Sequence, residues 1–159
     1  MLKGKGVSTG IGFGNIVILK NQERQIEKKI INDAEAELNK FKEALNRVML
    51  ETEELVNSIT GTEKEIMSAY LMIMQDPTLT METENAIKNL NYNAEYAVEV
   101  GFNGVIQIFE NMNDDYMAER ARDIADIKNR ILAKLLNETT TDISKLKENT
   151  IIVTTELTT

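Results

Sequence analysis

The chain has 159 residues, a hydrophobic share of 42% and a formal net charge of -8, with neither histidine nor cysteine. This length provides one ordinary domain, or one domain and part of another, with enough apolar residues to build a core. The negative charge argues against nucleic acid or an anionic membrane as the partner, because both repel such a surface and attract clustered Lys and Arg. A basic protein partner is the natural expectation.

The missing residue types exclude most catalytic chemistry. Histidine is the commonest general base and the acid-base residue of catalytic triads, and it would be required for a phosphohistidine. Without cysteine there are no disulfides, zinc-thiolate sites or thiol nucleophiles. We therefore expect no catalytic residue, metal site or cofactor in this chain. No run of about 18 apolar residues and no signal-peptide core occur, so we expect a cytoplasmic protein without membrane insertion.

Glycine and β-branched residues dominate the first twenty positions, MLKGKGVSTGIGFGNIVILK. This pattern predicts a turn, a short strand, a second turn and a second strand. The glycines lack the spacing of a nucleotide-binding loop, since neither G-x-G-x-x-G before a helix nor G-x-x-x-x-G-K-[ST] occurs. A glycine-rich hairpin is the simpler interpretation.

A long first helix is predicted from Asn32, which has the capping-box spacing with Glu35. Its apolar residues recur at alternating intervals of four and three positions. They are Ala34, Leu38, Phe41, Leu45, Val48, Thr52, Leu55 and Ile59. A single seam of this kind packs along a partner helix, in the same chain or in another.

The second helix carries more apolar residues than one seam requires. Thr62 and Glu65 form a second capping box, and the helix should kink or restart at Asp76, which precedes a proline. The inward face is expected to hold Ile66, Ala69, Ile73 and Leu79, in which case Met67, Tyr70, Met72 and Met74 cannot all be buried. The surplus of apolar side chains favours a surface that binds a partner. Alternatively, the kink at Asp76 turns these side chains into the core.

Two further helices follow. Asn93 should start the third, whose expected inner stripe is Ala97, Gly101, Gly104, Ile108 and Met112. The fourth is expected from about Tyr116 to Leu136, with Met117, Ala121, Ile124, Ile127, Ile131 and Leu135 inward. Four helices with short connections predict a bundle.

The segment NTIIVTTELTT contains a buried-strand pattern, Ile151 to Val153, so the predicted strands lie towards the two ends of the chain. The expected fold is mainly α: an antiparallel four-helix bundle, residues 21–146, inserted between short strand segments, residues 1–20 and 147–159. The strand segments are too few for a stable sheet and are expected to be the ends of an incomplete α/β subdomain. Unpaired strand ends also allow a homodimer.

Four segments occur in a characteristic order: STGIGFG, IMSAYLMIMQDPTL, DDYMAERARDIADIKNRIL and IIVTTELTT. Their order, over essentially the whole chain, resembles the amino-terminal part of enzyme I of the bacterial phosphoenolpyruvate:sugar phosphotransferase system. The third segment is the most specific of the four. In that family, phosphoenolpyruvate phosphorylates a histidine of enzyme I, which passes the phosphoryl group to a histidine of the carrier HPr.

The resemblance implies what this chain does and does not supply. The family's histidine motif, of the type G-G-x-T-S-H-x-A, follows the strand that IIVTTELTT resembles, so we expect it beyond Thr159. The barrel that binds phosphoenolpyruvate and Mg2+ is expected to lie outside this chain as well. The parent enzyme is therefore expected to be an active transferase, while this chain alone is inactive and docks HPr.

The resemblance places the HPr-docking surface on the second helix, its kink, and the starts of the third and fourth helices. The matching positions are Glu65, Tyr70, Met72, Ile73, Asp76, Leu79, Gly104, Phe109, Met117 and Arg120. Tyr70 stands where the family commonly has histidine, so the role expected there is an aromatic ring covering apolar surface.

The charged residues of the fourth helix divide between two roles. Asp123, Asp126, Lys128 and Arg130 are assigned to a solvated face or to pairing within the bundle. Met117 and Arg120 are three positions apart, share a face and are assigned to docking.

One function of another class remains open. A non-enzymatic helical adaptor, or a coiled coil that self-associates along the seam from Ala34 to Ile59, is compatible with the periodicity. Within the resembled family, sugar-uptake, nitrogen-regulatory and dihydroxyacetone-pathway relatives are not distinguished.

Overall fold

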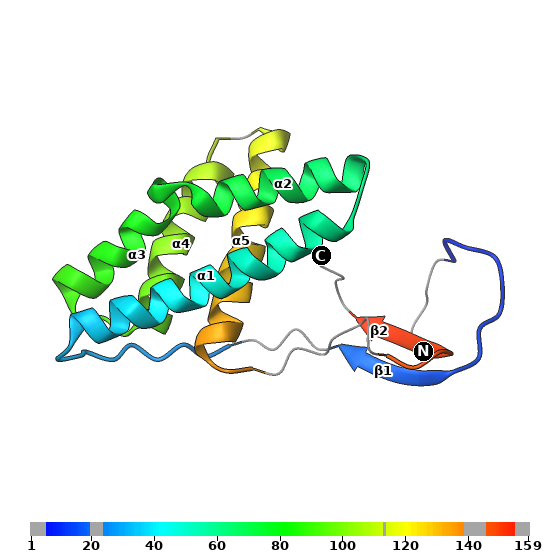
Figure 1. Ribbon diagram of the computed structural model, residues 1–159, viewed down its shortest axis with the longest axis horizontal. Coiled ribbons are helices and arrows are strands. Elements are labelled where there is room, and N and C mark those ends of the chain that lie inside the picture. Colours follow the sequence, from blue (N-terminus) through cyan, green and yellow to red (C-terminus); the bar gives the residue numbers. More distant parts are fainter. Residues whose placement is uncertain (1–5, 20–23, 113, 139–145, 155–159) are drawn as a thin grey trace. The chain divides into compact units, whose positions relative to one another are not determined.

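The computed structural model describes residues 6–19, 24–112, 114–138 and 146–154. It divides into two compact units, one from Met1–Arg24 and Thr140–Thr159 and the other from Gln25–Thr139. Among the described residues, the first unit holds two strands and the second holds five helices (Figure 1).

The strand unit joins segments from opposite ends of the sequence. β1 (Asn15–Leu19) and β2 (Thr150–Thr154) pair in parallel, with Asn15 opposite Thr150. The expected hairpin is wrong for residues 6–19, because they form one strand whose partner comes from the other end of the chain. Parallel strands require a long crossover, and the helical unit lies between them in sequence. An added Cβ on Gly14 would lie 1.9 Å from the Asn149 carbonyl oxygen, so this approach requires glycine.

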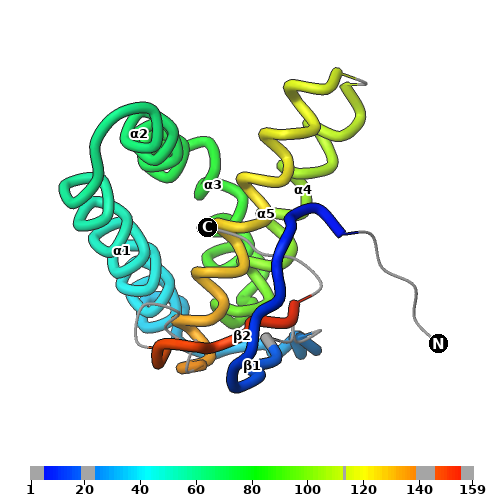
Figure 2. The backbone as a smooth tube through the Cα atoms, turned by 90° about the vertical axis from the view of Figure 1, so that its right-hand side faces the viewer, coloured from blue at the N-terminus to red at the C-terminus, as the bar shows by residue number. Residues whose placement is uncertain are grey.

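The helical unit consists of α1 (Ala34–Ser58), α2 (Thr62–Gln75), α3 (Pro77–Leu90), α4 (Ala94–Glu110) and α5 (Asp115–Leu135). The expected break is confirmed: Asp76 caps α3 by accepting a hydrogen bond from the Thr78 N–H at 2.9 Å, and Pro77 begins that helix. α2 and α3 follow each other directly, so the five helices form four successive helical runs (Figure 2).

Two predicted helix starts are displaced. The N-cap of α1 is Asp33 rather than Asn32, because the Asp33 carboxylate accepts from the backbone N–H three residues on, at 2.9 Å. The predicted capping box of Thr62 and Glu65 is wrong, since Gly61 is the N-cap of α2 and no side chain caps this helix. The predicted start of α4 at its N-cap, Asn93, is confirmed.

The seam of α1 is buried inside its own chain. α1 packs against α2 and α5, and to a lesser extent against α3 and α4. Phe41, Val48 and Thr52 are fully buried, whereas Leu55 is exposed and the neighbouring Val56 takes its place. A seam that is filled within the chain has little surface for a second copy, so the adaptor or coiled coil joined along it is not favoured.

The inner stripe of α4 differs from the expected one. Gly104, Ile108 and Met112 are exposed, while the fully buried side chains of this helix include Val98 and Phe102. Larger apolar side chains bury more area and so determine which face of a helix turns inward. The predicted stripe contained two glycines, which have no side chain to bury and so contribute little to the choice of the inward face.

The helices α3 and α4 approach closely at Thr83 and Gly101. An added Cβ on Gly101 would lie 2.5 Å from the Thr83 hydroxyl oxygen and 2.7 Å from its backbone nitrogen. Thr83 is fully buried, and its hydroxyl oxygen has no hydrogen-bond partner among the described residues.

No helix within the described ranges has the length and apolar character needed to cross a membrane.

We expect Gly101→Ala to lower the free energy of unfolding by about 1 to 3 kcal/mol, because the new methyl group overlaps the α3 backbone. Gly104→Ala is the matched control on the same helix, since an added Cβ there meets nothing within 4 Å. The control should be neutral or stabilising by up to about 1 kcal/mol through helix propensity. Urea denaturation measures both, and equal effects would contradict the close approach.

Candidate functional site

A cleft opens between α2 and the first half of α5. Its lining residues are Glu65, Ile66, Ala69 and Tyr70 from α2, and Tyr116, Glu119, Arg120, Arg122 and Asp123 from α5. α2 packs mainly on α1 and only sparsely on α5, whereas α5 packs mainly on α4. Both helices also pack on α1, and Figure 2 shows α2 standing apart from the first turns of α5.

The buried face of α2 is not the predicted one. Met67, Tyr70 and Met74 point into the helical unit, whereas Ile66, which was expected inward, is 62% exposed and lines the cleft. Met72 is 71% exposed on the same helix. Part of the apolar surplus therefore remains at the surface, as a protein-binding face requires.

The structure brings three of the ten predicted docking residues together at this cleft: Glu65, Tyr70 and Arg120. Of the others, Met72, Asp76 and Gly104 are exposed, Ile73, Phe109 and Met117 are half-buried, and Leu79 is buried in the core. Tyr70 and Leu79 are therefore too buried to contact a partner over much of their surface, and they can contribute only by supporting the exposed residues around them.

Sequence reasoning missed several of the lining residues. Tyr116, Glu119 and Arg122 lie on the same turns of α5 as Arg120, and this proximity was a usable signal. Ile66 was missed because its helix face was assigned inward.

Arg120 is held in place by its own helix. Its Nε and Nη2 donate to the Tyr116 hydroxyl at 3.1 and 3.0 Å, and its Nη1 donates to the Asp123 carboxylate at 3.2 Å. The guanidinium also lies 5.0 Å from the centre of the Tyr116 ring. A guanidinium has five N–H groups, so two remain beyond these three hydrogen bonds. The side chain is therefore oriented before any partner arrives.

The Asp123 carboxyl has a raised pKa because burial disfavours its charged form. Arg120 opposes this rise, while the nearby charges of Glu119 and Asp126 add to it. The cleft thus carries carboxylates and guanidinium groups within one short stretch of α5.

Tyr70 has a polar partner in addition to its apolar packing. Its hydroxyl donates a hydrogen bond to the Asp126 carboxylate of α5, and the ring is buried. Burial and the Asp126 charge both raise the pKa of the Tyr70 hydroxyl. Asp126 pairs within the helical unit, and so does Lys128, which donates to Asn103 at 2.8 Å. These contacts agree with the sequence assignment of Asp126 and Lys128.

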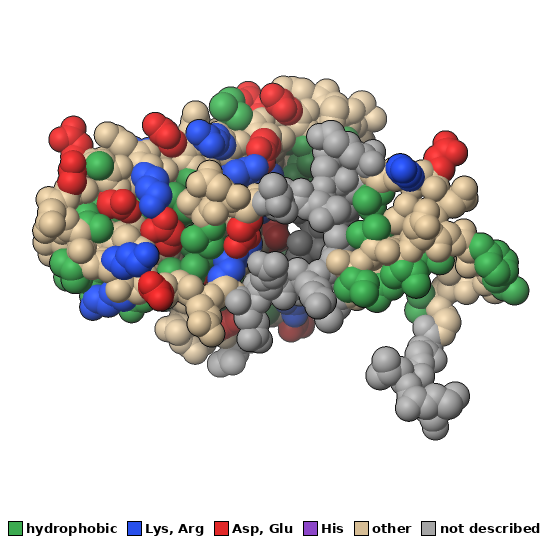
Figure 3. All heavy atoms as spheres, turned by 90° about the horizontal axis from the view of Figure 1, so that it is seen from below, with side chains coloured by type: hydrophobic (Ala, Val, Ile, Leu, Met, Phe, Trp, Pro, Cys, Tyr) green, Lys and Arg blue, Asp and Glu red, His purple; other side chains and the backbone are tan. Residues whose placement is uncertain are grey.

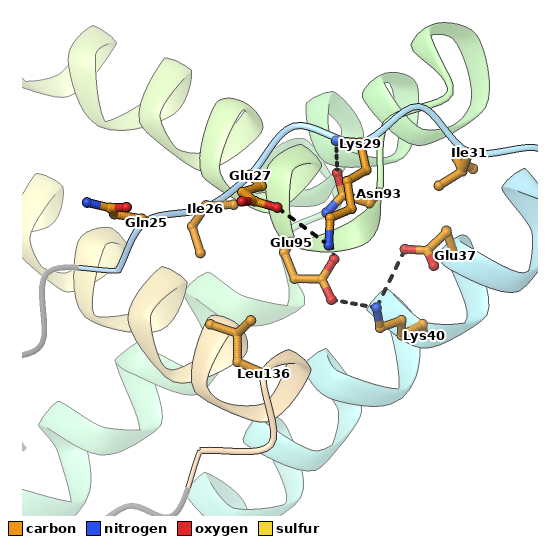
Figure 4. A pocket seen from close by; sticks show the side chains of 10 residues that line it. All are labelled: Gln25, Ile26, Glu27, Lys29, Ile31, Glu37, Lys40, Asn93, Glu95 and Leu136. Atoms are coloured by element: carbon orange, nitrogen blue, oxygen red, sulfur yellow. Dashed lines mark hydrogen bonds and ion pairs between the residues drawn. The ribbon is translucent and has the colours of Figure 1, made fainter.

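A second, polar hollow lies where α1 and α4 begin and α5 ends (Figure 4). Lys40 donates to Glu95 at 2.5 Å, and the Glu37 carboxylate accepts from the Ala94 N–H at 2.6 Å. Asn93 accepts from the Lys29 N–H at 2.8 Å, which fastens the segment before α1 to the start of α4. The polar groups of this hollow bond to one another and connect α1 with α4, so we assign it a structural role.

Metal binding has no support within the described ranges, where no group of three or more His, Cys, Asp or Glu side chains is placed to hold an ion. The residues described therefore do not fit the Mg2+ that the resemblance implies for the whole enzyme.

The family model described as PEP-utilising enzyme, N-terminal, matches residues 3–120. The chain belongs to this family. Phosphoenolpyruvate-protein phosphotransferases of Bacillus subtilis and Staphylococcus carnosus are each 34% identical to it over 161 residues. Those alignments cover 99% of this chain but 28% of each relative, so the chain spans a little over a quarter of their length.

Solved structures agree with this family assignment. A solution structure of Enzyme I (nEIt) superposes with a TM-score of 0.84 at 34% identity, covering 99% of this chain and 66% of the other. An N-terminal domain of Enzyme 1 - Nitrogen gives a TM-score of 0.71 at 20% identity, which shows the fold alone. The resemblance to the amino-terminal part of enzyme I is confirmed, as is a mainly helical fold with a small sheet.

We expect Asp123→Asn to raise the melting temperature at pH 7. The folded-state pKa of this carboxyl lies above its ordinary value because the group is partly buried, so the folded state holds the proton more tightly than the unfolded state. Stability linked to this group is present at low pH and is lost as pH rises through the folded-state pKa. The asparagine avoids that loss while keeping an acceptor for Arg120.

The advantage of Asp123→Asn should shrink as the pH is lowered towards 4. Asp115→Asn, at an exposed position near the start of the same helix, is the control and should not raise the melting temperature. Melting curves across this range measure both variants. A destabilised Asp123→Asn at pH 7 would show that the Arg120 ion pair outweighs burial.

Proposed function

We propose that this chain is the HPr-docking portion of a phosphoenolpyruvate-protein phosphotransferase, enzyme I of the sugar phosphotransferase system. The observation that carries the proposal is the cleft between α2 and α5, which is lined by Glu65, Tyr70 and Arg120 in a chain of this family. The whole enzyme would pass a phosphoryl group from phosphoenolpyruvate through its own histidine to HPr in the cytoplasm. This chain has no histidine, so it would supply docking alone.

The proposal extends to the architecture of the parent enzyme. Residues 21–146 would form an antiparallel four-helix docking subdomain, and residues 1–20 and 147–159 would be the ends of an α/β subdomain. Two observations support this arrangement: the separation of the helical unit from the strand unit, and the direct succession of α2 and α3.

The surface around the cleft combines apolar area with charge of both signs. Ile66 offers an exposed apolar side chain at the cleft, Met72 offers another elsewhere on α2, and Arg120 offers an oriented hydrogen-bond donor. Glu65 and Glu119 at the cleft favour a basic surface on the partner. Apolar anchors and an arginine contribute most to affinity, while carboxylates at the rim mainly speed association.

Association of two copies through the strand unit is a separate proposal. Ile16, Ile18 and Val153 are exposed there, and Figure 3 shows apolar side chains gathered at the surface of this unit. A two-stranded sheet with open edges can pair with another chain. Light scattering at several concentrations tests the proposal, and a monomer throughout would reject it.

We expect Met117→Ala and Arg120→Ala each to weaken HPr binding by about tenfold, the scale of one interfacial anchor. Helicity should not change, because neither residue is part of the fully buried core. Lys88→Ala is the charge-matched control, since Lys88 lies near the end of α3 and outside the cleft. Calorimetric titration measures the affinities, and three equal values would remove both residues from the docking surface.

Incubation with phosphoenolpyruvate and Mg2+ should leave the mass of the chain unchanged, because it has no histidine to accept the phosphoryl group. Intact-mass spectrometry measures this directly. Stoichiometric phosphorylation would require another acceptor and would contradict a role limited to docking.

A further inference from the structure

Tyr70 joins the two walls of the cleft. We propose that Tyr70 is a positioning residue: its hydrogen bond to Asp126 holds α2 at a defined distance from α5 and so sets the width of the cleft that receives the partner. The inference rests on the proposed docking function of this cleft and assigns Tyr70 a role other than direct contact.

Few contacts join α2 directly to α5. Both helices pack on α1, and the hydrogen bond between Tyr70 and Asp126 is one of the few direct links between them. Tyr70 lies near the middle of α2, and Asp126 lies on α5 one turn beyond Asp123, a residue that lines the cleft. Their hydrogen bond therefore connects the two helices that form the walls of the cleft.

The chemistry of the pair suits a permanent tie. A neutral phenol donating to a carboxylate forms a charge-assisted hydrogen bond, which is stronger than one between neutral groups. Burial and Asp126 raise the pKa of the Tyr70 hydroxyl, while the nearby Arg130 guanidinium opposes the rise without cancelling it. The hydroxyl therefore keeps its proton and remains a donor near neutral pH.

Exposure separates this role from that of a contact residue. Tyr70 is 7% exposed, so its ring offers the partner little area, whereas its neighbour Ile66 is 62% exposed. Without the tie, the part of α2 that carries Glu65 and Ile66 would be less constrained. Binding would then have to order it, which reduces affinity although no contact with the partner is removed.

The test is a double-mutant cycle in the full 159-residue chain, with HPr affinity measured by calorimetric titration. Tyr70→Phe keeps the ring and removes only the donor, and Asp126→Asn weakens the acceptor. We expect each single variant to weaken binding by about threefold to tenfold, the scale of one hydrogen bond. The double variant should bind no more weakly than the weaker single variant, because both changes break the same tie.

A matched control removes a tyrosine hydroxyl elsewhere in the helical unit. The Tyr92 hydroxyl accepts from Lys28 at 3.0 Å in the connection between α3 and α4, outside the cleft. Tyr92→Phe should bind HPr as tightly as the unsubstituted chain.

A second readout separates positioning from general stability. In Tyr70→Phe, hydrogen exchange should be faster in the amides of α2 and unchanged in those of α4. If Tyr70→Phe does not fold, Asp126→Asn decides the question.

Additive losses in the cycle, or a Tyr70→Phe chain that binds like the unsubstituted one, would overturn the tie while leaving the docking function in place. Failure of the unsubstituted chain to bind HPr would overturn the docking function and the tie together. The two failures are therefore distinguishable.

Discussion

The close approach of α3 and α4 at Thr83 and Gly101 is the constraint on which the helical unit depends. A side chain at Gly101 would separate these helices, and α4 is also the main support of α5. α3 begins directly after α2, at Pro77, and α2 packs against α1. The cleft lies between α2 and α5, which both pack on α1 but make few contacts with each other.

In the proposed docking cleft, some side chains serve to position others. Arg120 is oriented by Tyr116 and Asp123 on its own helix, while Tyr70 reaches across to Asp126. Both arrangements reduce the conformational freedom that binding would otherwise remove. The polar hollow at the other ends of α1 and α5 contrasts with this, since its charges pair with each other.

Much of the fold and part of the site could be predicted from the sequence. The helical runs, the break at Asp76 and the family were all recognisable, because caps, proline and motif order are local signals. The inward faces of α2 and α4 were assigned wrongly in part. Ile66 was expected inward and is exposed, whereas Tyr70 was expected at the surface and is buried. Both side chains are apolar enough for either face, so their burial depends on how the neighbouring helices pack.

The sequence by itself determined what the chain cannot carry, a phosphohistidine or a thiolate, because composition requires no geometry. It also determined where helices begin and end to within a few residues, since those signals act over one or two turns. Only the tertiary structure decided that β1 pairs with β2 in parallel and that Tyr70 bonds to Asp126. Both contacts join residues far apart in the chain, and such pairings depend on how whole elements pack, which no local pattern encodes.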